Sequence, residues 1–271
     1  MPHPATARAP ARASARAPAR ALGHASVRAL PALVSVGALV LAWELYARLS
    51  GVSPATLPAP SRVLAQTWLN RDALWRNTWP TIGATTAGFA CSLATAFALS
   101  VAIDFARPLR RALFPVFVIS QTLPLVALAP LVVLWFGFGL APKIGLVALV
   151  TFFPMLVALV DGYDATQPEI ERFLASMGAS RGTIFRRARL PSGLPHFFAG
   201  LKISITYAVV AAIFAEHAGA ARGLGIFILN AKNSFRPDLV LAAVLVSSAL
   251  TLVLFGLASL LQRLSMPWRR P

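Results

Sequence analysis

Long apolar stretches separated by short charged segments dominate the chain. Six of these stretches approach the roughly 20 apolar residues that a helix needs to cross the hydrocarbon core of a bilayer. They are residues 29–47, 79–103, 112–136, 143–160, 198–217 and 239–262. The pattern predicts an all-α, polytopic membrane protein with six transmembrane helices.

The overall composition agrees with a membrane protein. Of the 271 residues, 57% are hydrophobic and only 13% are charged, which lies outside the usual range of a water-soluble domain. Most of the apolar stretches are rich in Ala, Gly, Ser and Thr, which allow helices to approach closely. A packed helical bundle is therefore expected.

The net charge of +16 predicts the orientation of these helices. By the positive-inside rule, Lys and Arg accumulate in cytoplasmic segments. Of the 25 basic residues, 17 lie in the N-terminal tail, in the segment after the second stretch, in residues 161–202 and at the C-terminus. Both termini are therefore expected in the cytoplasm, in contact with anionic lipid. Nucleic-acid binding is not expected, because no soluble segment presents a basic face with interleaved aromatics.

Residues 1–28 consist largely of Ala, Arg and Pro and contain no acidic residue. We interpret them as a disordered, basic cytoplasmic tail. The same composition also fits a transit peptide, so their retention in the mature chain stays open.

The segment 164–191, between the fourth and fifth stretches, predicts an ordered amphipathic structure. Pro168 suits the first turn of a short helix, Thr166 or Asp164 can cap it, and Gly178 can close it in a left-handed conformation. Its apolar face comprises Ile170, Phe173, Leu174 and Met177. Ser180 can cap a second, arginine-rich helix that Leu190 and Pro191 end. The segment could rest on lipid headgroups, close the end of the bundle or dock a soluble partner.

A polar path through the bundle is expected near the third and fourth stretches. These contain four prolines, each of which frees a backbone carbonyl that must face protein or water, although the prolines could equally serve only to kink the helices for packing. Gln121 and Thr122 are candidates for lining this path. Glu216, near the outer end of the fifth stretch, is the preferred gate residue, although it and Glu44 could simply reach water.

Several residues resemble a known sequence motif. Gly178, Ile184 and Phe185, followed by "LPSGLP" and "AGL", resemble the cytoplasmic loop motif of the permease subunits of ABC importers. That motif opens with Glu-Ala-Ala, where this chain has "RFL", so the first half departs from the pattern. Within the family, "QTLPLVALAPLVVLWFGFGLAPK", "FFPMLVALVDG", "AVVAAIFAEHAGAARGLG" and "MPWRR" most resemble permeases for a hydroxymethylpyrimidine, a thiamine precursor. Sulfonate, taurine and nitrate permeases share a looser version.

The resemblance implies a type I ABC importer permease fold and a set of partners. Residues 29–78 would form the first transmembrane helix and an outer loop, 79–265 the permease domain, and 266–271 a cytoplasmic tail. In such importers the loop is a coupling helix that sits in a groove on a separate ATPase subunit. A binding protein delivers the solute, and a homodimer forms the pathway in the bacterial inner membrane.

The resemblance also implies roles for single residues. Ile170, Phe173, Leu174 and Met177 would contact the ATPase groove and Gly178 would allow the sharp turn. Leu190, Pro191 and Pro195 would carry movement into the fifth helix. The chain lacks the G-x-x-x-x-G-K-[ST] sequence that cradles nucleotide phosphates, so ATP and Mg²⁺ are expected on the partner and no cofactor in this chain.

Other classes of protein are less well supported by the residues. The four histidines are scattered, no H-E-x-x-H sequence occurs, and the single Cys91 rules out a cysteine-clustered zinc site, so neither catalytic nor metal-ligating residues are expected. A secondary transporter driven by an ion gradient is the alternative. It would be expected to show inverted repeats and an acidic residue at mid-bilayer, which the sequence does not display clearly.

Overall fold

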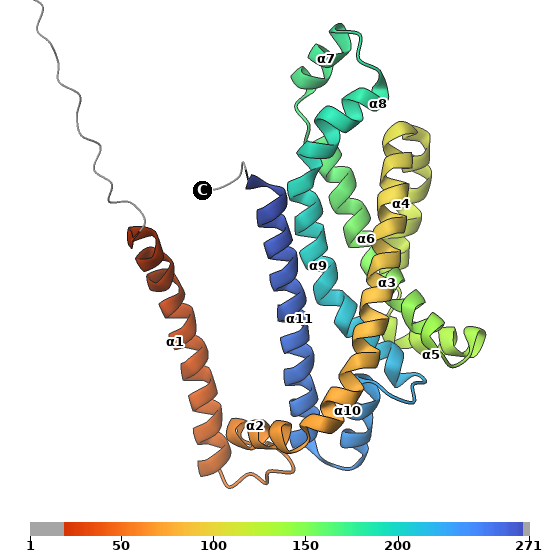
Figure 1. Ribbon diagram of the computed structural model, residues 1–271. Coiled ribbons are helices and arrows are strands. Elements are labelled where there is room, and N and C mark those ends of the chain that lie inside the picture. The colour runs from red at the N-terminus through yellow and green to blue at the C-terminus, as the bar shows by residue number, and fades with distance from the viewer. Residues whose placement is uncertain (1–18, 268–271) are drawn as a thin grey trace, which may run out of the picture.

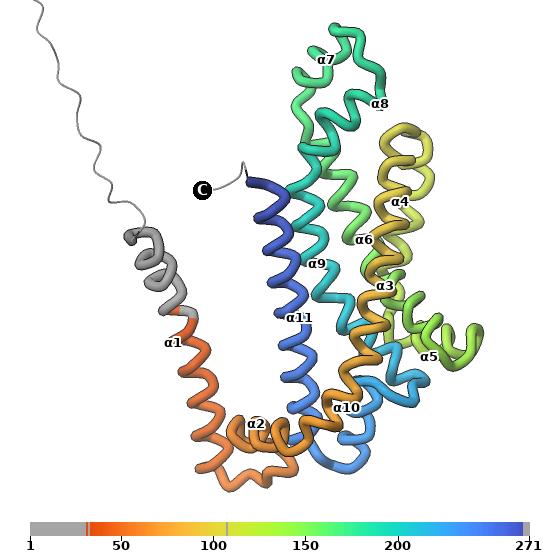
Figure 2. The backbone as a smooth tube through the Cα atoms, in the orientation of Figure 1, coloured from red at the N-terminus to blue at the C-terminus, as the bar shows by residue number. Residues whose placement is uncertain are grey.

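The computed structural model describes residues 19–267, apart from the side chains of residues 19–30, 32 and 107, and the regular elements in these residues are all helices (Figures 1 and 2). This confirms the predicted all-α class. The elements are α1 (Ala19–Leu49), α2 (Pro60–Leu69), α3 (Arg71–Phe105), α4 (Arg107–Gln121), α5 (Leu125–Phe136), α6 (Leu140–Asp164), α7 (Pro168–Ser176), α8 (Arg181–Ile184), the π-helical turn η1 (Phe185–Arg189), α9 (Leu190–His217), α10 (Leu224–Asn233) and α11 (Pro237–Ser265).

The centre of the bundle is α6, which packs against both α3 and α9. Small residues permit this close packing: a Cβ atom added to Gly200 of α9 would lie 2.4 Å from the Cβ atom of Ala158 on α6. Similarly, a Cβ atom on Gly88 of α3 would lie 2.6 Å from the Cβ atom of Val147. The predicted close approach of helices rich in small residues is therefore present.

The two ends of the bundle carry different elements (Figure 1). The start of α1, the end of α11, and α7 and α8 lie at one end, and α2 and α10 lie at the other. Both ends of the described chain thus lie on the side of the segment 164–191. The six crossings and the cytoplasmic placement of the termini stay predictions.

Among the described residues, four helices have the length and hydropathy to cross a membrane: α3, α6, the continuous helix Arg181–His217, and α11. They contain the predicted stretches 79–103, 143–160, 198–217 and 239–262. The helix α1 contains the stretch 29–47, and its membrane crossing stays a prediction.

The prediction of one helix over residues 112–136 is wrong. The structure divides this stretch into α4 and α5, whose axes differ by 101°. Pro124 lacks a backbone donor and disfavours the helical conformation of the residue before it, so the chain turns at Thr122–Pro124. The α4–α5 pair is either one broken span, which would make a fifth crossing, or a re-entrant loop.

Two predicted boundaries also need correction. Leu190 and Pro191 do not end the arginine-rich helix, because α8, η1 and α9 form one continuous helix of 37 residues. Pro191 has no backbone N–H to donate. Directly before it, the π-turn changes the hydrogen bonding, because the Leu190 amide donates to the Phe185 carbonyl.

At the N-terminus, α1 begins at Ala19, so the end of the predicted 1–28 tail is helical. Residues 1–18 and 268–271 lie outside the described residues.

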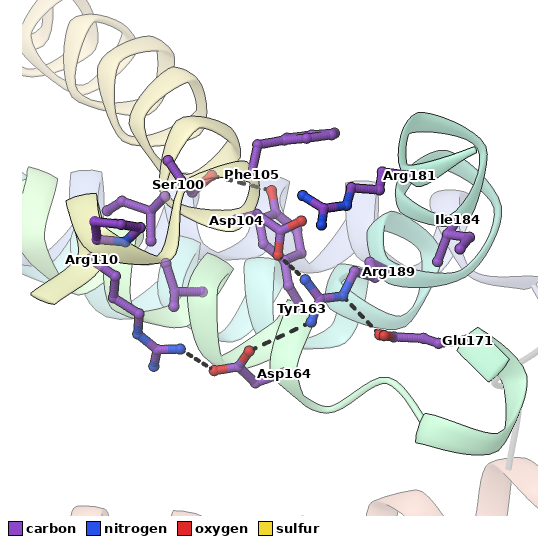
Figure 3. Close-up of a pocket in the computed structure, with 14 residues that line it drawn as sticks. Ser100, Asp104, Phe105, Arg110, Tyr163, Asp164, Glu171, Arg181, Ile184 and Arg189 are labelled. Atoms are coloured by element: carbon purple, nitrogen blue, oxygen red, sulfur yellow. Dashed lines mark hydrogen bonds and ion pairs between the residues drawn. The ribbon is translucent and has the colours of Figure 1, made fainter. Parts of the chain in front are cut away.

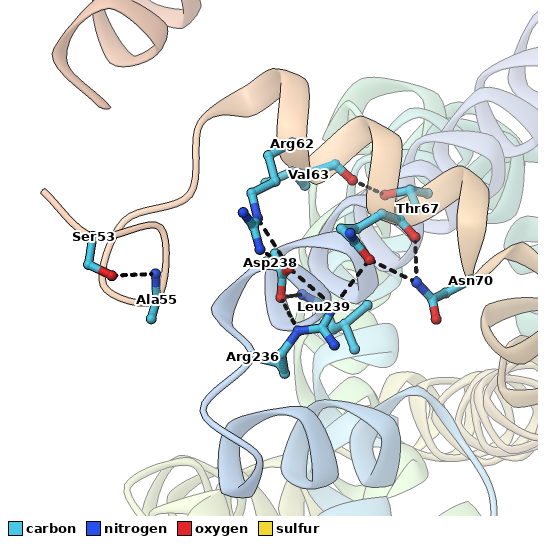
Figure 4. A network of polar contacts seen from close by, with 10 residues as sticks. Ser53, Ala55, Arg62, Val63, Thr67, Asn70, Arg236, Asp238 and Leu239 are labelled. Carbon is cyan, nitrogen blue, oxygen red and sulfur yellow. Dashed lines mark hydrogen bonds and ion pairs between the residues drawn. The ribbon is translucent and has the colours of Figure 1, made fainter. Parts of the chain in front are cut away.

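A polar network fastens α2 to α11 at the end opposite α7 (Figure 4). Asp238, only 2% exposed, accepts hydrogen bonds from Arg236 Nε at 3.0 Å and from Arg62 Nε at 3.4 Å. The hydrogen bond to Asp238 raises the pKa of the Arg236 guanidinium. Trp68 and Trp75 are exposed, which is common for aromatic residues at a membrane surface, whereas Leu74 is buried.

Candidate functional site

The short helix α7 stands at the tip of the molecule with none of its residues buried (Figure 1). Phe173 is 63% exposed and Met177 is 70% exposed, and Ile170 is exposed beside them. Leu174, on the same face, is half-buried. The predicted apolar face therefore exists and is open to a partner, which does not support the interpretation that it closes the bundle.

The turn after α7 has the geometry expected for a glycine-closed helix. Gly178 has a φ of +79°, in the left-handed region. Its amide donates to the Ala175 carbonyl at 3.0 Å, and the Ala179 amide donates to the Leu174 carbonyl at 3.1 Å. This pair of hydrogen bonds is the Schellman motif. The predicted role of Gly178 in ending the helix is confirmed.

The start of α7 differs from the sequence prediction in one respect. Pro168 occupies the first turn as expected, but the cap residue is Gln167, which makes no side-chain cap bond. Asp164 instead ends α6, and the buried hydroxyl of Thr166 has no hydrogen-bond partner among the described residues. Both were predicted as possible caps. Ser180 does cap α8, since its hydroxyl accepts from the Thr183 amide at 3.3 Å.

Arg189, the last residue of η1, lies among three carboxylates (Figure 3). It forms an ion pair with Asp104 of α3, another with Glu171 of α7 at 2.8 Å, and a longer one with Asp164 at 3.8 Å. Arg110 of α4 contacts Asp164 from the other side at 2.6 Å. We call these five residues the Arg189 cluster. No local sequence pattern indicates this cluster, because its members lie far apart along the chain.

The aromatic ring of Phe185 anchors η1 in the core. Phe185 is buried, and its ring centroid lies 5.1 Å from that of Tyr163 and 5.6 Å from that of Phe105. The exposed arginines of α8 and η1 lie around this anchor; they are Arg181, Arg186 and Arg187. The segment thus combines an exposed apolar helix, an exposed basic turn and the buried side chain of Phe185.

The residues predicted to carry movement lie at the start of α9. Leu190 packs against the main apolar cluster of α3, α6 and α9, Pro191 is exposed in the first turn, and Pro195 lies within the helix. These residues are therefore continuous with η1.

At the opposite end of α9, Glu216 is fully buried. Its carboxylate accepts hydrogen bonds from the Thr81 hydroxyl at 2.7 Å and from the Gly225 amide at 2.7 Å. The expectation that Glu216 could reach water is wrong. Sequence reasoning found this residue but missed its partner on α3.

Three successive amides at the start of α10 bind side chains around Glu216. Gly223 donates to Asn77 Oδ1 at 3.0 Å and Leu224 donates to Thr81 Oγ1 at 2.9 Å, beside the Gly225 bond to Glu216. A Cβ atom on Gly223 would lie 2.2 Å from Glu216 Cδ. These groups form the Glu216 cluster, in which the free backbone amides at the N-terminus of α10 donate hydrogen bonds to side chains of α3 and α9.

Gln121 and Thr122 lie at the break between α4 and α5, and both are exposed. The Thr122 hydroxyl donates to the Ile119 carbonyl at 2.8 Å. Glu44, the other acidic residue expected near water, accepts from the Ser61 amide at 2.9 Å and so joins α1 to α2. The structure does not bring Gln121, Thr122 and Glu216 together into one site within a single chain.

A comparison with protein families identifies this architecture. Residues 94–266 match the model of the binding-protein-dependent transport system inner membrane component. The chain belongs to this family.

Individual relatives of this permease agree with the assignment. It is 34% identical over 233 residues to the formylaminopyrimidine transport permease protein ThiX of Halalkalibacterium halodurans, covering 86% of this chain and 93% of the relative. It is also 34% identical over 242 residues to the riboflavin transport system permease protein RibX of Chloroflexus aurantiacus, covering 89% and 90%. A structure of the MetNI methionine ABC transporter has the same fold, with a TM-score of 0.63 at 17% identity, over 70% of this chain and 95% of that one.

The permease is thus a multi-pass membrane protein with the fold of ABC importer permeases. Members of its family are transport components of importers and not enzymes. The resemblance drawn from the loop motif and the C-terminal half of the sequence is confirmed.

The turn at Gly178 gives a first testable prediction for the permease. Gly178→Ala should cost about 1–2 kcal/mol locally, because a Cβ atom is unfavourable at a left-handed φ, and so should increase amide hydrogen exchange in residues 168–176. Gly182→Ala is the matched control, since Gly182 is helical and a Cβ atom there meets no other atom within 4 Å. Equal exchange in the two variants, measured by mass spectrometry, would show that the turn does not hold α7.

Proposed function

We propose that this permease forms the membrane pathway of an ATP-driven importer for a small solute that a separate binding protein delivers. ATP and Mg²⁺ bind to a partner ATPase subunit, and the importer resides in the bacterial inner membrane. The observation that carries the proposal is the family match over residues 94–266, together with relatives aligned along nearly their whole length. The ion-gradient alternative is not favoured, because the family is binding-protein-dependent.

The exposed face of α7 supports a coupling role. Ile170, Phe173, Leu174 and Met177 form an apolar knob on an otherwise charged tip, which suits insertion into a groove on the ATPase. Gly178 fixes the direction of the chain after the knob. Movement then enters α9 through Leu190, Pro191 and Pro195, because η1 and α9 are one continuous helix.

A homodimer is proposed to complete the pathway. Large apolar side chains remain exposed on α5 and just after it, as expected if this region faces a second copy or lipid; they include Leu134, Trp135, Phe136 and Phe138. Gln121 and Thr122, at the break beside α5, would then contribute polar groups to the path. Glu216 would act as a gate by holding α10 in place, and not by contacting the solute.

For the solute, we propose a hydroxymethylpyrimidine-type thiamine precursor. A formylaminopyrimidine permease supports a pyrimidine, and a riboflavin permease of equal identity makes a flavin the second candidate. Both solutes are nitrogen heteroaromatics. The looser resemblance to sulfonate, taurine and nitrate permeases makes those anions further alternatives.

Uptake into proteoliposomes tests the solute class. The permease would be reconstituted with the ATPase and the binding protein encoded nearest to it, and ATP-dependent uptake of radiolabelled hydroxymethylpyrimidine measured. Excess unlabelled formylaminopyrimidine should suppress uptake, and excess taurine should leave it unchanged. Uptake of riboflavin or taurine in place of the pyrimidine would reject the proposed solute and retain the importer.

A further inference from the structure

The Arg189 cluster connects the π-turn η1 to four helices, α3, α4, α6 and α7, at the end of the bundle that carries α7. One guanidinium contacts Glu171 on α7, Asp104 in the last turn of α3 and Asp164 at the end of α6. Arg110 of α4 holds Asp164 from the other side. A displacement of α7 can therefore act on the ends of α3, α4 and α6 through side chains as well as through the backbone.

The central pair of the cluster is shielded from solvent. The side chain of Arg189 is 23% exposed and that of Asp104 is 10% exposed, whereas Asp164 is 46% exposed. Charges that are partly buried are screened less by salt and cost more to separate than surface pairs. The contact of Arg189 with Asp104 is thus the fixed side of the cluster, and the contacts with α7 and α6 are the more exposed side.

The π-turn decides where Arg189 points. A π-helical turn holds one more residue than an α-helical turn, and one residue corresponds to roughly 100° of rotation about the axis. Arg189 is the last residue of η1, so this turn sets the direction of its side chain. Single π-turns of this kind often occur at functional positions in helices.

A cavity of about 650 Å³ beside the cluster leaves room for its side chains to exchange partners. Its charged lining comprises Asp104, Arg110, Asp164, Glu171, Arg181 and Arg189 (Figure 3). Asp164 Oδ1 already lies 3.8 Å from Arg189 Nη2, while Glu171 is bonded at 2.8 Å. If α7 moves away with Glu171, Asp164 is in position to take its place.

We propose that Arg189 is a positioning residue that transmits movement of α7 to the transmembrane helices by exchanging Glu171 for Asp164 while it keeps Asp104. The proposal rests on the proposed function, because the partner ATPase supplies the movement. The cluster thereby has two arrangements, one with α7 attached and one with α7 released. A network with two discrete arrangements can carry energetic coupling between distant sites.

The first test measures the ATP consumed per solute imported by the reconstituted complex. Glu171→Gln should raise this ratio about tenfold while the complex still assembles, because α7 moves without pulling on Arg189. Arg189→Lys, which keeps the charge and loses the planar fork, should give an intermediate ratio. Arg186→Gln is the matched control: Arg186 lies exposed in the same π-turn and forms no ion pair with any residue that the structure describes.

A ratio for Glu171→Gln equal to that of the wild type would overturn the proposal. A purely structural role would lower hydrolysis and import together through loss of assembled complex and leave the ratio unchanged, which also overturns it. The ratio for Arg186→Gln should equal that of the wild type. An increase in that control would show that any lost positive charge uncouples the importer, and so would overturn the specific role of Arg189.

The second test needs no ATPase, so it separates failure of this proposal from failure of the proposed function. In the full chain in detergent, Glu171→Gln and Arg189→Gln should each increase amide hydrogen exchange in residues 168–176, and Arg186→Gln should not. Unchanged exchange in both variants would reject the cluster as the attachment of α7. Increased exchange in a chain that binds no ATPase would retain the attachment and reject the coupling function.

Discussion

Replacing Met177 by Asp should prevent stable assembly of this permease with the proposed ATPase subunit. Met177 is 70% exposed at the end of α7, so the change leaves the fold of the permease intact. In an apolar groove the new carboxylate would be buried without a partner, which costs several kcal/mol. The amount of ATPase co-purified with the permease should therefore fall at least about tenfold.

Ala175→Asp provides the matched control for this prediction. Ala175 is also exposed on α7, but it lies on the opposite face from the apolar knob, and the substitution adds the same charge. Co-purification should stay close to wild type. Equal loss in both variants would indicate a general effect of charge at the tip, and wild-type behaviour of both would favour a helix that rests on lipid headgroups.

Replacing Glu216 by Leu should destabilise the end of the bundle that carries α10. The Gly225 amide would lose its acceptor in a buried site, which costs about 1–3 kcal/mol, whereas the Thr81 hydroxyl can still donate to the Asn77 carbonyl at 3.2 Å. The midpoint of thermal unfolding in detergent should fall, and amide exchange at the start of α10 should increase.

Glu216→Gln separates the hydrogen bonds from the charge. The amide oxygen can still accept from Gly225, so this variant should unfold closer to wild type than Glu216→Leu. It should also retain transport, because the Glu216 cluster acts by holding α10. Loss of transport in a Glu216→Gln variant that unfolds like wild type would contradict this account and indicate direct contact of the carboxylate with the solute.

Local patterns in the sequence were enough to predict α7 and its turn. The apolar spacing from Ile170 to Met177, Pro168 in the first turn and Gly178 after the last turn are all short-range signals, and each appears in the structure. The same holds for the long apolar helices. Their length and hydropathy reflect the bilayer and do not depend on tertiary contacts.

Features that depend on contacts between distant segments were missed. Asp104 and Arg189 have no sequence relation that predicts their pairing, and Thr81 looks like an ordinary hydroxyl in an apolar helix. The break at Pro124 was missed for another reason. Prolines also occur within membrane helices that continue, such as Pro154 in α6, so sequence alone did not separate a kink from a break.

The most direct test of α7 as a coupling helix is solute-stimulated ATP hydrolysis in liposomes that contain the permease with the proposed ATPase and binding protein. We expect the solute-loaded binding protein to stimulate hydrolysis, Met177→Asp to abolish the stimulation and Ala175→Asp to preserve it. A permease that assembles with no ATPase, or stimulation that survives Met177→Asp, would contradict the assignment of α7 as the coupling helix.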